Sequence, residues 1–325
     1  MATEIDAAAH RLASGEVIAV PTETVYGLGA DATNEKAVAK IFALKGRPAD
    51  HPLIVHFSNP AAISYWSSEV PREARILAAH FWPGPLTMIL RKADRVPKIV
   101  TGGQDTVGLR CPSHPVAQEL LAEFARIGSG AVAAPSANKF GHVSPTTAAH
   151  VREEFGPDLF ILDGGACDVG LESTIVDLSR GKPVLLRPGA ITRDDIAHVL
   201  GASPEDSDAA APRASGTLAA HYAPRTALAI VEAAALDIEL ARPANIAVLA
   251  LREPPPSAHV TSWITAPFDV GRYAHDLYAN LRKLDASGAK RIVVEAPPTT
   301  PPWEAVNDRL LRAAAGAGGP LDDEP

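Results

Sequence analysis

The spacing of apolar residues along the chain predicts alternating strands and helices up to about residue 200. Short apolar runs bounded by turn residues are typical of strands, and they lie at residues 17–21, 53–57, 86–90, 107–110, 131–134, 159–162, 174–177 and 184–186. Patterns typical of helices lie at residues 4–13, 34–44, 72–81, 116–124, 147–154 and 194–200. Asn34 is suited to cap the second of these helices. The alternation predicts an α/β fold built on a sheet.

A polar stretch divides the chain into two regions. Residues 202–220 contain almost no large apolar side chain and are expected to form a linker. The α/β pattern then resumes, with strands expected at 228–231, 246–251 and 292–294 and helices at 273–284 and 303–315. We therefore expect a catalytic domain over residues 1–201, a linker over 202–222 and a smaller α/β domain over 223–325. The tail from residue 316 is expected to be disordered.

The composition limits the classes of protein to which the chain can belong. Its net charge of −8 argues against a dedicated nucleic-acid-binding protein, which would carry a strongly basic face, but it leaves room for a local basic pocket. The two cysteines, Cys111 and Cys167, form no Cys-x-x-Cys pair, so neither a structural zinc site nor a disulfide framework is expected. No apolar run is long enough to cross a membrane and the N-terminus does not resemble a signal peptide, so we expect a cytoplasmic protein.

Polar side chains gather in the loops that follow predicted strands, where open α/β sheets bind their ligands. Thr22 and Thr24 lie two residues apart in PTETVYGLGAD, so their hydroxyls project to the same side of an extended segment; a glycine turn with surface threonines is the alternative. Lys45 and Arg47 flank a glycine just past a helix. The helix C-terminus explains Lys45 as a compensating charge, whereas Arg47 lies beyond it. This arrangement favours a phosphate-binding role for the pair.

Further hydroxyl and guanidinium groups follow in later loops. Arg110 ends an apolar strand directly before a proline-stiffened loop, so it either pairs with a buried carboxylate or awaits an anionic ligand. Ser136 and Asn138 follow the strand at 131–134, and a simple Ser/Asn turn is the alternative. Ser173 opens one strand and Arg187 ends the next. Together these groups predict a pocket for an anionic, phosphate-rich ligand.

Common catalytic patterns are missing from the sequence or fail on their context. It contains no Ser-His-Asp order, no His-Glu-x-x-His and no Walker loop, so hydrolase and P-loop assignments lack their required parts. Residues 27–32 fit a relaxed dinucleotide-binding pattern, with Asp50 about twenty residues further on. That acidic residue should close a strand, whereas Asp50 precedes one. The dinucleotide pattern is therefore set aside.

The ordered motifs PTETVYGLGADA, KGRPADHPLIVH, FWPGPLT, VGLRCPSHP, APSANKFGHVSPT and LESTIVD…LLRPGAI closely resemble the YrdC-domain family over residues 15–192. HYAPRTAL at 221–228 and WEAVNDRLLRAAAG at 303–316 are similar to the long, two-domain members of that family. The resemblance implies a twisted mixed sheet with a concave, positively lined active site, followed by a smaller Rossmann-like α/β domain.

The resemblance also implies an activity, in which L-threonine, bicarbonate and ATP give threonylcarbamoyl-AMP and pyrophosphate. This is the first step of threonylcarbamoyladenosine formation in tRNA. ATP is then a substrate that carries Mg²⁺ on its phosphates, with no metal held by the protein itself. A tRNA-modifying transferase complex would act downstream, and RNA contact is possible.

Roles for individual residues carry over motif by motif. The resemblance implies that Lys45 and Arg47 are catalytic. It implies L-threonine binding by Thr24, His56, Arg110, the backbone at Ala134, and Ser173. It implies ATP binding by Arg47, His51, Thr106, Ser136, Asn138, Ser144, Arg187 and Tyr222. At position 51 many relatives carry asparagine in place of histidine. The linker, which leads directly into His221 and Tyr222, is expected to act as a lid; a passive spacer is the alternative.

Two other functions compete with this assignment. A carbamoyltransferase of hydrogenase maturation also contains a YrdC-like domain, but it resembles a much longer chain with zinc-finger modules, for which this chain is too short and too poor in cysteine. An RNA-binding YrdC module without turnover is the second alternative. The net charge of −8 argues against it.

Overall fold

The computed structural model describes residues 2–241 and 244–318. The chain divides into two compact units. The first comprises residues 1–139, 145–168 and 172–217, and the second comprises residues 140–144, 169–171 and 218–325. The first unit therefore includes most of the segment expected to be a linker. The predicted tail falls largely on residues 319–325, which lie outside the described part.

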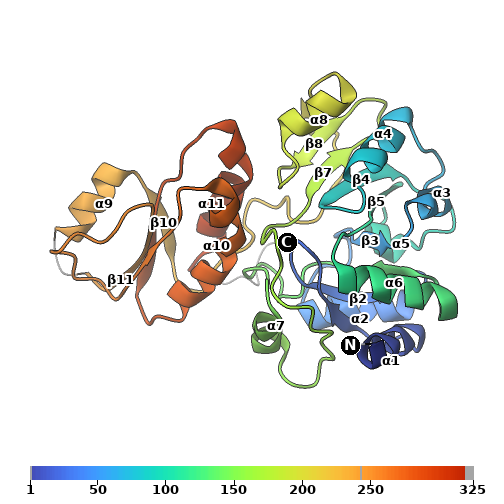
Figure 1. Ribbon diagram of the computed structural model, residues 1–325, viewed down its shortest axis with the longest axis horizontal. Helices are drawn as coiled ribbons and strands as arrows, with labels where there is room; N and C mark the ends of the chain where they lie inside the picture. Colours follow the sequence, from blue (N-terminus) through green and yellow to red (C-terminus); the bar gives the residue numbers. More distant parts are fainter. Residues whose placement is uncertain (1, 242–243, 319–325) are drawn as a thin grey trace. The chain divides into compact units, whose positions relative to one another are not determined.

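The first unit is built on a mixed sheet (Figure 1). Within the described residues its nine strands lie in the order β1 (Ile18–Val20), β2 (Gly27–Asp31), β6 (Ala131–Ala133), β3 (Ile54–Phe57), β5 (Thr106–Arg110), β4 (Leu86–Arg91), β7 (Thr174–Asp177), β8 (Val184–Arg187) and β9 (Glu205–Asp206). The pairs β3–β5, β4–β7 and β8–β9 are parallel and the other neighbours are antiparallel. The expected mixed α/β sheet is confirmed.

Helices lie on both faces of this sheet. They are α1 (Ala2–Ala13), α2 (Glu35–Lys45), α3 (Ile63–Trp66), α4 (Arg72–Phe81), α5 (Lys98–Thr101), α6 (Pro115–Ile127), α7 (Ala148–Phe155) and α8 (Arg193–Leu200), with a short 3₁₀ turn at Pro60–Ala62. Helix α2 begins where the Asn34 side chain accepts the Ala37 N–H and ends at Gly46, whose φ of 66° is left-handed. The sequence alone indicated both the capping Asn34 and the glycine just past the helix.

The alternation of side chains along each strand separates two faces of the sheet. Val55 and Phe57 on β3, with Val107 and Leu109 on β5, join the main core under α2 and α4. On the opposite face, α1 and α6 pack together over the β1–β6 side. Further along that face, Ile54, Ile89, Ile175, Val184 and Leu186 form an apolar cluster, and Ala211 and Ala214 of the linker pack against it. No helix takes part in that cluster as the structure describes it.

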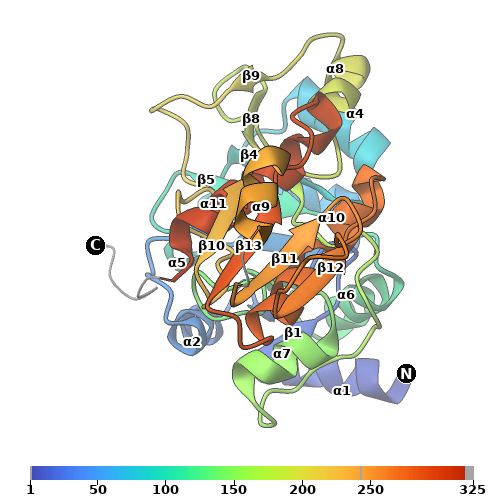
Figure 2. The same ribbon diagram turned by 90° about the vertical axis from the view of Figure 1, so that its left-hand side faces the viewer.

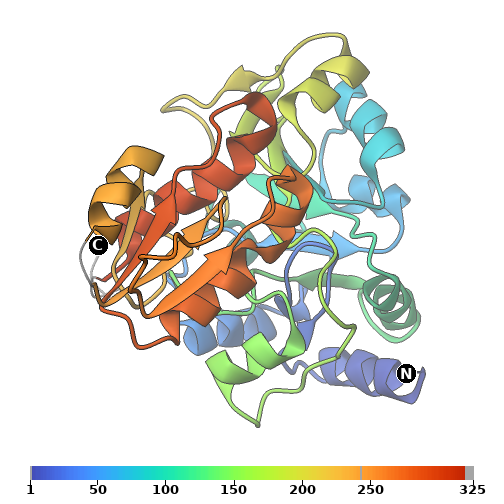
Figure 3. The same cartoon turned by 60° about the vertical axis from the view of Figure 1, so that its left-hand side comes forward.

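The second unit is a four-stranded parallel sheet within the described residues. Figure 2 shows its strands in the order β10 (Leu228–Val231), β13 (Arg291–Glu295), β11 (Ile246–Ala250) and β12 (Ser262–Thr265). Helix α9 (Ala233–Leu240) lies on one face, and α10 (Val270–Asp285) and α11 (Glu304–Gly316), which follows a 3₁₀ turn at Pro301–Trp303, lie on the other (Figures 1 and 3). A parallel sheet with helices on both faces confirms the expected Rossmann-like domain.

Several segments differ from the sequence prediction, which did not include α3, α5, α9, β9 or β12. Residues 159–162 make only an isolated bridge, in which Ile161 pairs with Ala19 of β1, so they add no strand to the sheet. Residues 27–31 form strand β2 where a glycine turn was the alternative. A Cβ on Gly29 would lie 2.7 Å from the Val132 side chain, so a glycine here leaves room for that side chain.

Candidate functional site

The loop between β1 and β2 presents two threonines with different tasks. The Thr22 hydroxyl accepts the backbone N–H groups of Thr24 and Val25, at 3.2 Å each, and so closes a local turn. The Thr24 hydroxyl lies 2.9 Å from that of Thr22 and also accepts a hydrogen bond of 2.9 Å from Arg110 Nη1. Both threonines are buried. Thr24 therefore connects the loop to the end of β5.

Arg110 is a buried guanidinium with only 4% of its surface exposed. Its Nη2 lies 2.7 Å from Oε1 of Glu23, and its Nε donates a longer bond of 3.4 Å to the Gly84 carbonyl. The sequence left open whether this arginine pairs with a carboxylate or awaits a ligand. The structure gives it a buried carboxylate, Glu23, which the sequence analysis did not single out. The available signal was an acidic residue inside a motif whose neighbours are apolar or hydroxyl-bearing.

His56 lies beside Arg110, because the two residues are paired across the parallel strands β3 and β5. Both side chains leave the sheet on the face opposite the main core, since the residues that alternate with them belong to that core. Burial, with a further contribution from the Arg110 charge, lowers the pKa of His56 to about 3. The imidazole is therefore neutral near pH 7, and its Nδ1 lies 3.1 Å from the Ile54 carbonyl.

The remaining residues predicted for threonine come from neighbouring strands of the same sheet. Ala134 directly follows β6, and its N–H donates to the Ile54 carbonyl at 3.0 Å. The Ser173 hydroxyl lies 2.8 Å from that of Thr87 and accepts a bond of 3.2 Å from Arg187 Nη2. The five predicted residues thus belong to β3 and β5 or adjoin β2, β6 and β7, within a run of six neighbouring strands that also contains β4.

Lys45 connects the end of helix α2 to the loop that carries Ser136 and Asn138. Its Nζ donates to the backbone carbonyls of Ser136 and Asn138, at 2.6 and 2.5 Å, so it bonds this loop and not the carbonyls of its own helix. Burial, together with the Arg47 charge, holds its pKa well below the usual value. The Asn138 side chain donates to the Lys139 carbonyl and is itself buried. Lys45 is therefore placed to order the loop that carries Ser136 and Asn138.

Two buried guanidinium groups converge on Ser215 of the linker. Arg187 Nη1 donates to the Ser215 carbonyl at 2.7 Å, and Arg47 Nη2 lies 3.5 Å from the Ser215 hydroxyl. Arg187 also donates to the Ser173 carbonyl through Nε and Nη2. His51 is half-buried nearby, and burial followed by the Arg47 charge lowers its pKa. The arrangement concentrates positive charge beside the apolar cluster on which Ala211 and Ala214 of the linker pack.

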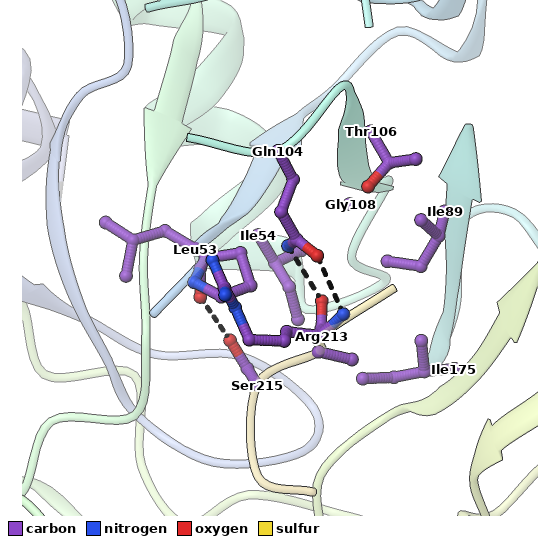
Figure 4. Close-up of a pocket in the computed structure, with 11 residues that line it drawn as sticks. Leu53, Ile54, Ile89, Gln104, Thr106, Gly108, Ile175, Arg213 and Ser215 are labelled. Atoms are coloured by element: carbon purple, nitrogen blue, oxygen red, sulfur yellow. Dashed lines mark hydrogen bonds between the residues drawn. The ribbon is translucent and has the colours of Figure 1, made fainter. Parts of the chain in front are cut away.

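A small pocket opens beneath the linker (Figure 4). It is lined in part by Ser215, the residue that Arg187 and Arg47 contact. Its floor is apolar, with Ile54, Ile89 and Ile175, and Thr106 stands at its edge. The side-chain amide of Gln104 pairs with the linker backbone at Arg213, accepting its N–H at 2.8 Å and donating to its carbonyl at 3.1 Å. The linker is therefore bound to the first unit at this point.

Further contacts anchor the same linker segment. The Arg213 guanidinium donates to the carbonyls of Asp50 and Gly102, and the Ser215 hydroxyl donates to the Pro52 carbonyl at 2.8 Å. Residues 213–215 thus form a cover over the pocket, held by both side-chain and backbone bonds.

Two residues predicted to bind ATP, Ser144 and Tyr222, fall in the second unit. Tyr222 is held there by its neighbours, since its ring stacks on that of Tyr278 with centroids 5.7 Å apart and the Arg309 guanidinium lies 5.3 Å from its centroid. Its φ of 61° is left-handed, which is rare for a residue with a side chain. The predicted contacts of Ser144 and Tyr222 with ATP stay predictions.

No group of three or more His, Cys, Asp or Glu side chains in the described part of the chain is arranged to hold a metal ion. No helix there is long and apolar enough to cross a membrane.

Comparisons with known proteins cover both units. A family model for Sua5, YciO and YrdC proteins, described as "Telomere recombination", matches residues 10–189, and a model described as "Threonylcarbamoyl-AMP synthase, C-terminal domain" matches residues 191–315. A relative from Bacillus subtilis, named threonylcarbamoyl-AMP synthase, is 39% identical over 96% of this chain and 93% of its own length. One of the same name from Pyrococcus abyssi is 44% identical over 70% of this chain and 68% of its own length.

A solved structure resembles the whole fold. The crystal structure of P. abyssi Sua5 complexed with L-threonine superposes with a TM-score of 0.88 at 36% identity, covering 96% of this chain and 94% of that one.

Proposed function

The chain belongs to the Sua5, YciO and YrdC family, and we infer from its site that it synthesises threonylcarbamoyl-AMP from L-threonine, bicarbonate and ATP, with release of pyrophosphate. It is a nucleotidyltransferase that acts in tRNA modification. One observation carries the assignment to this site. The buried guanidinium groups of Arg47 and Arg187 converge beside a second buried arginine site at Arg110, so one sheet face offers places for a polyphosphate and for a carboxylate.

The amino-acid half of the site is proposed to lie around Arg110. Its guanidinium would receive the threonine carboxylate, and Thr24, which it already contacts, would complete that end. The neutral ring of His56 is suited to a hydrogen bond with the threonine hydroxyl, because it carries no charge that the site must compensate. The backbone at Ala134 and the Ser173 hydroxyl are proposed as further contacts. These residues occupy neighbouring strands, which is the geometry that a small ligand needs.

The nucleotide half is proposed to lie around Arg47 and Arg187, which would bind the triphosphate. Lys45 would act by ordering the Ser136–Asn138 loop, from which both side chains are proposed to contact ATP. Thr106 at the pocket edge and the half-buried His51 are proposed as further contacts. Mg²⁺ is proposed to travel with the phosphates and water, because the described residues offer no cluster that fits it.

The chemistry asked of this site is mainly placement and charge neutralisation. The threonine amine takes up bicarbonate as a carbamate, whose oxygen then attacks the α-phosphate in line as pyrophosphate leaves. Phosphoryl-type transfers need little covalent participation from the protein. A site rich in fixed guanidinium groups, with no activated nucleophile among the residues described above, is suited to this task.

An RNA-binding module without turnover is supported less well. The three arginines of the site are each less than 10% exposed, so they are not available to the backbone of an RNA duplex. The net charge of −8 points the same way. Contact with tRNA, a downstream transferase complex and a cytoplasmic location stay predictions.

The direct test measures pyrophosphate release from ATP with both co-substrates present and with each omitted in turn. We expect release to require L-threonine and bicarbonate together. Equal release when either is left out would contradict the assignment.

A further inference from the structure

Glu23 is a buried carboxylate for which the proposed reaction has so far given no task. It is 3% exposed and lies in the loop between β1 and β2, directly between the two threonines. Its Oε1 is 2.7 Å from Arg110 Nη2. Burial alone would raise its pKa, but the Arg110 guanidinium and nearby backbone N–H groups bring the pKa below its ordinary value. Glu23 is therefore an ionised group inside the amino-acid half of the site.

The contacts of this carboxylate are incomplete. The Arg110 guanidinium and the backbone N–H groups of Glu23 and Ser113 lie near this carboxylate. Within the described part of the chain, however, neither Oε1 nor Oε2 accepts a well-aligned hydrogen bond, and Arg110 Nη2 donates none. A buried carboxylate that serves only structure normally has its lone pairs satisfied, because an unsatisfied charged oxygen is costly. The pair is thus a close ion pair that retains unused acceptor capacity on Glu23 and donor capacity on Arg110.

The charges of Glu23 and Arg110 indicate which kind of ligand would bind to the pair. Glu23 and Arg110 together are neutral, so a carboxylate arriving at Arg110 would add an uncompensated negative charge to a buried site. An α-amino acid brings a compensating charge with it, because its ammonium is attached to the carbon next to its carboxylate. The buried pair therefore offers one positive and one negative group, side by side, to a ligand that carries the opposite two.

We propose that Glu23 receives the ammonium group of the amino-acid substrate while Arg110 receives its carboxylate, so that the pair selects a zwitterion. The inference deepens the proposed function and rests on it. Glu23 is thus a specificity-determining residue, and acids that lack an α-amino group are excluded because they leave its charge unpaired.

The test measures binding of two ligands in the absence of ATP and bicarbonate, by calorimetry. The ligands are L-threonine and (R)-3-hydroxybutanoate, which keeps the carboxylate and hydroxyl but lacks the amine. Glu23→Gln should weaken threonine binding by about ten- to one-hundred-fold, the range for one charge-assisted hydrogen bond. It should leave hydroxybutanoate binding unchanged or tighten it, because a repulsive charge is removed. Glu295→Gln, the same change at a buried carboxylate of the second unit, is the matched control and should alter neither.

Equal weakening of both ligands by Glu23→Gln would overturn the proposal, since it would show that Glu23 only supports Arg110. If Glu23→Gln does not fold, Glu23→Asp keeps the charge but withdraws it by one methylene, and the same contrast between ligands is expected. The pH dependence of threonine binding to the unaltered protein is an independent test of the proposal. Its affinity for threonine should fall as rising pH removes the ammonium proton, whereas an affinity that holds or rises would contradict the role of Glu23. If the protein bound no threonine at any pH, the proposed function itself would fail.

Discussion

At the scale of single residues, Arg110 carries the clearest energetic consequence. Removing its guanidinium leaves Glu23 buried without its counter-charge and removes the proposed partner of the threonine carboxylate. Losing one member of a buried charge pair costs about 2–5 kcal/mol of binding free energy, and about 1.4 kcal/mol corresponds to a factor of ten. Arg110→Ala should therefore weaken threonine use by roughly thirty- to several-thousand-fold and change ATP affinity much less.

The measurement for Arg110→Ala is steady-state pyrophosphate release over a range of threonine concentrations, with ATP affinity determined separately. Arg126→Ala, a change at an exposed arginine on α6, is the control and should behave like the unaltered protein. If ATP binding fell while threonine binding survived, Arg110 would belong to the phosphates.

His56 makes a prediction about pH. Its pKa of about 3 in the folded protein lies below the ordinary value of about 6.5, so between these values the unfolded chain binds the proton and the folded one does not. The free energy of unfolding should therefore decrease as pH falls from about 6.5 towards 3. His56→Asn should lack this part of the decrease. Denaturant unfolding of both proteins at several pH values would check it, and parallel curves would show that His56 is not buried neutral.

The sequence predicted Arg110 and His56 as site residues but not the partner of Arg110. An arginine at the end of an apolar strand is conspicuous, because a buried charge needs an explanation. Glu23 lies 87 residues earlier, and only folding brings β5 against the β1–β2 loop. Nothing in the local pattern around Glu23 encodes that pairing. A missed partner of this kind is the expected limit of an argument from one sequence.

At the scale of elements, the contact between α2 and the Ser136–Asn138 loop can be tested through Lys45. Its amino group donates to two loop carbonyls, and leaving a buried acceptor without a donor costs about 1–3 kcal/mol. Lys45→Met keeps the length and removes the donor, so the protein should lose stability of that order and also bind ATP more weakly. Denaturant unfolding and ATP titration measure the two effects.

Arg47→Ala separates the two roles proposed for this segment. Arg47 bonds the Pro52 carbonyl at 3.1 Å and approaches the Ser215 hydroxyl, whereas Lys45 bonds the carbonyls of the Ser136–Asn138 loop. It should therefore lower turnover with less loss of stability than Lys45→Met. If both variants lost stability while keeping normal activity per folded molecule, the pair would be structural.

Elements were predicted correctly where the residues that determine them lie close together in the sequence. Helix α2 was predicted from a capping asparagine and from the spacing of its apolar residues, and both signals lie within the helix or next to it. Strand β2 was not predicted, because its Gly27 and Gly29 are explained by the neighbouring side chains of Ala134 and Val132, which lie far away in the sequence. Residues 159–162 are apolar enough for a strand, yet they find one bridging partner in β1. Where pairing with a neighbouring strand determines whether a strand forms, the apolar periodicity of the sequence alone does not predict it.

At the scale of the whole molecule, the linker is more firmly attached than its polarity suggested. It lacks large apolar side chains, yet Ala211 and Ala214 are small enough to pack on the Ile54–Ile175 cluster. The Gln104 amide and the Arg187 guanidinium bond its backbone, which no side-chain pattern in the linker reveals. The sequence therefore predicted the two α/β regions correctly, while the attachment of the segment between them depends on backbone contacts.

These contacts sharpen the prediction that the linker is a lid. Arg187 now donates to the Ser215 carbonyl and Arg47 approaches the Ser215 hydroxyl, so the two groups proposed to bind the triphosphate also hold the cover over the pocket. Closing the pocket would exclude water and protect a labile carbamate and acyl-adenylate. A chain ending near residue 200 should then fold but lose most synthesis, measured as pyrophosphate release that depends on threonine. Tyr222→Ala should weaken ATP binding in the full chain.

Limited proteolysis distinguishes a lid from a spacer in the intact protein. If ATP engages the linker, it should slow cleavage between Asp206 and Ser215. Arg213→Ala should speed cleavage there without ATP, because it removes the bonds to the Asp50 and Gly102 carbonyls. Arg225→Ala, an arginine beyond the linker, is the matched control and should leave cleavage in this stretch unchanged. A passive spacer would be cleaved at the same rate with and without ATP, and the chain ending near residue 200 would then be stable and fully active.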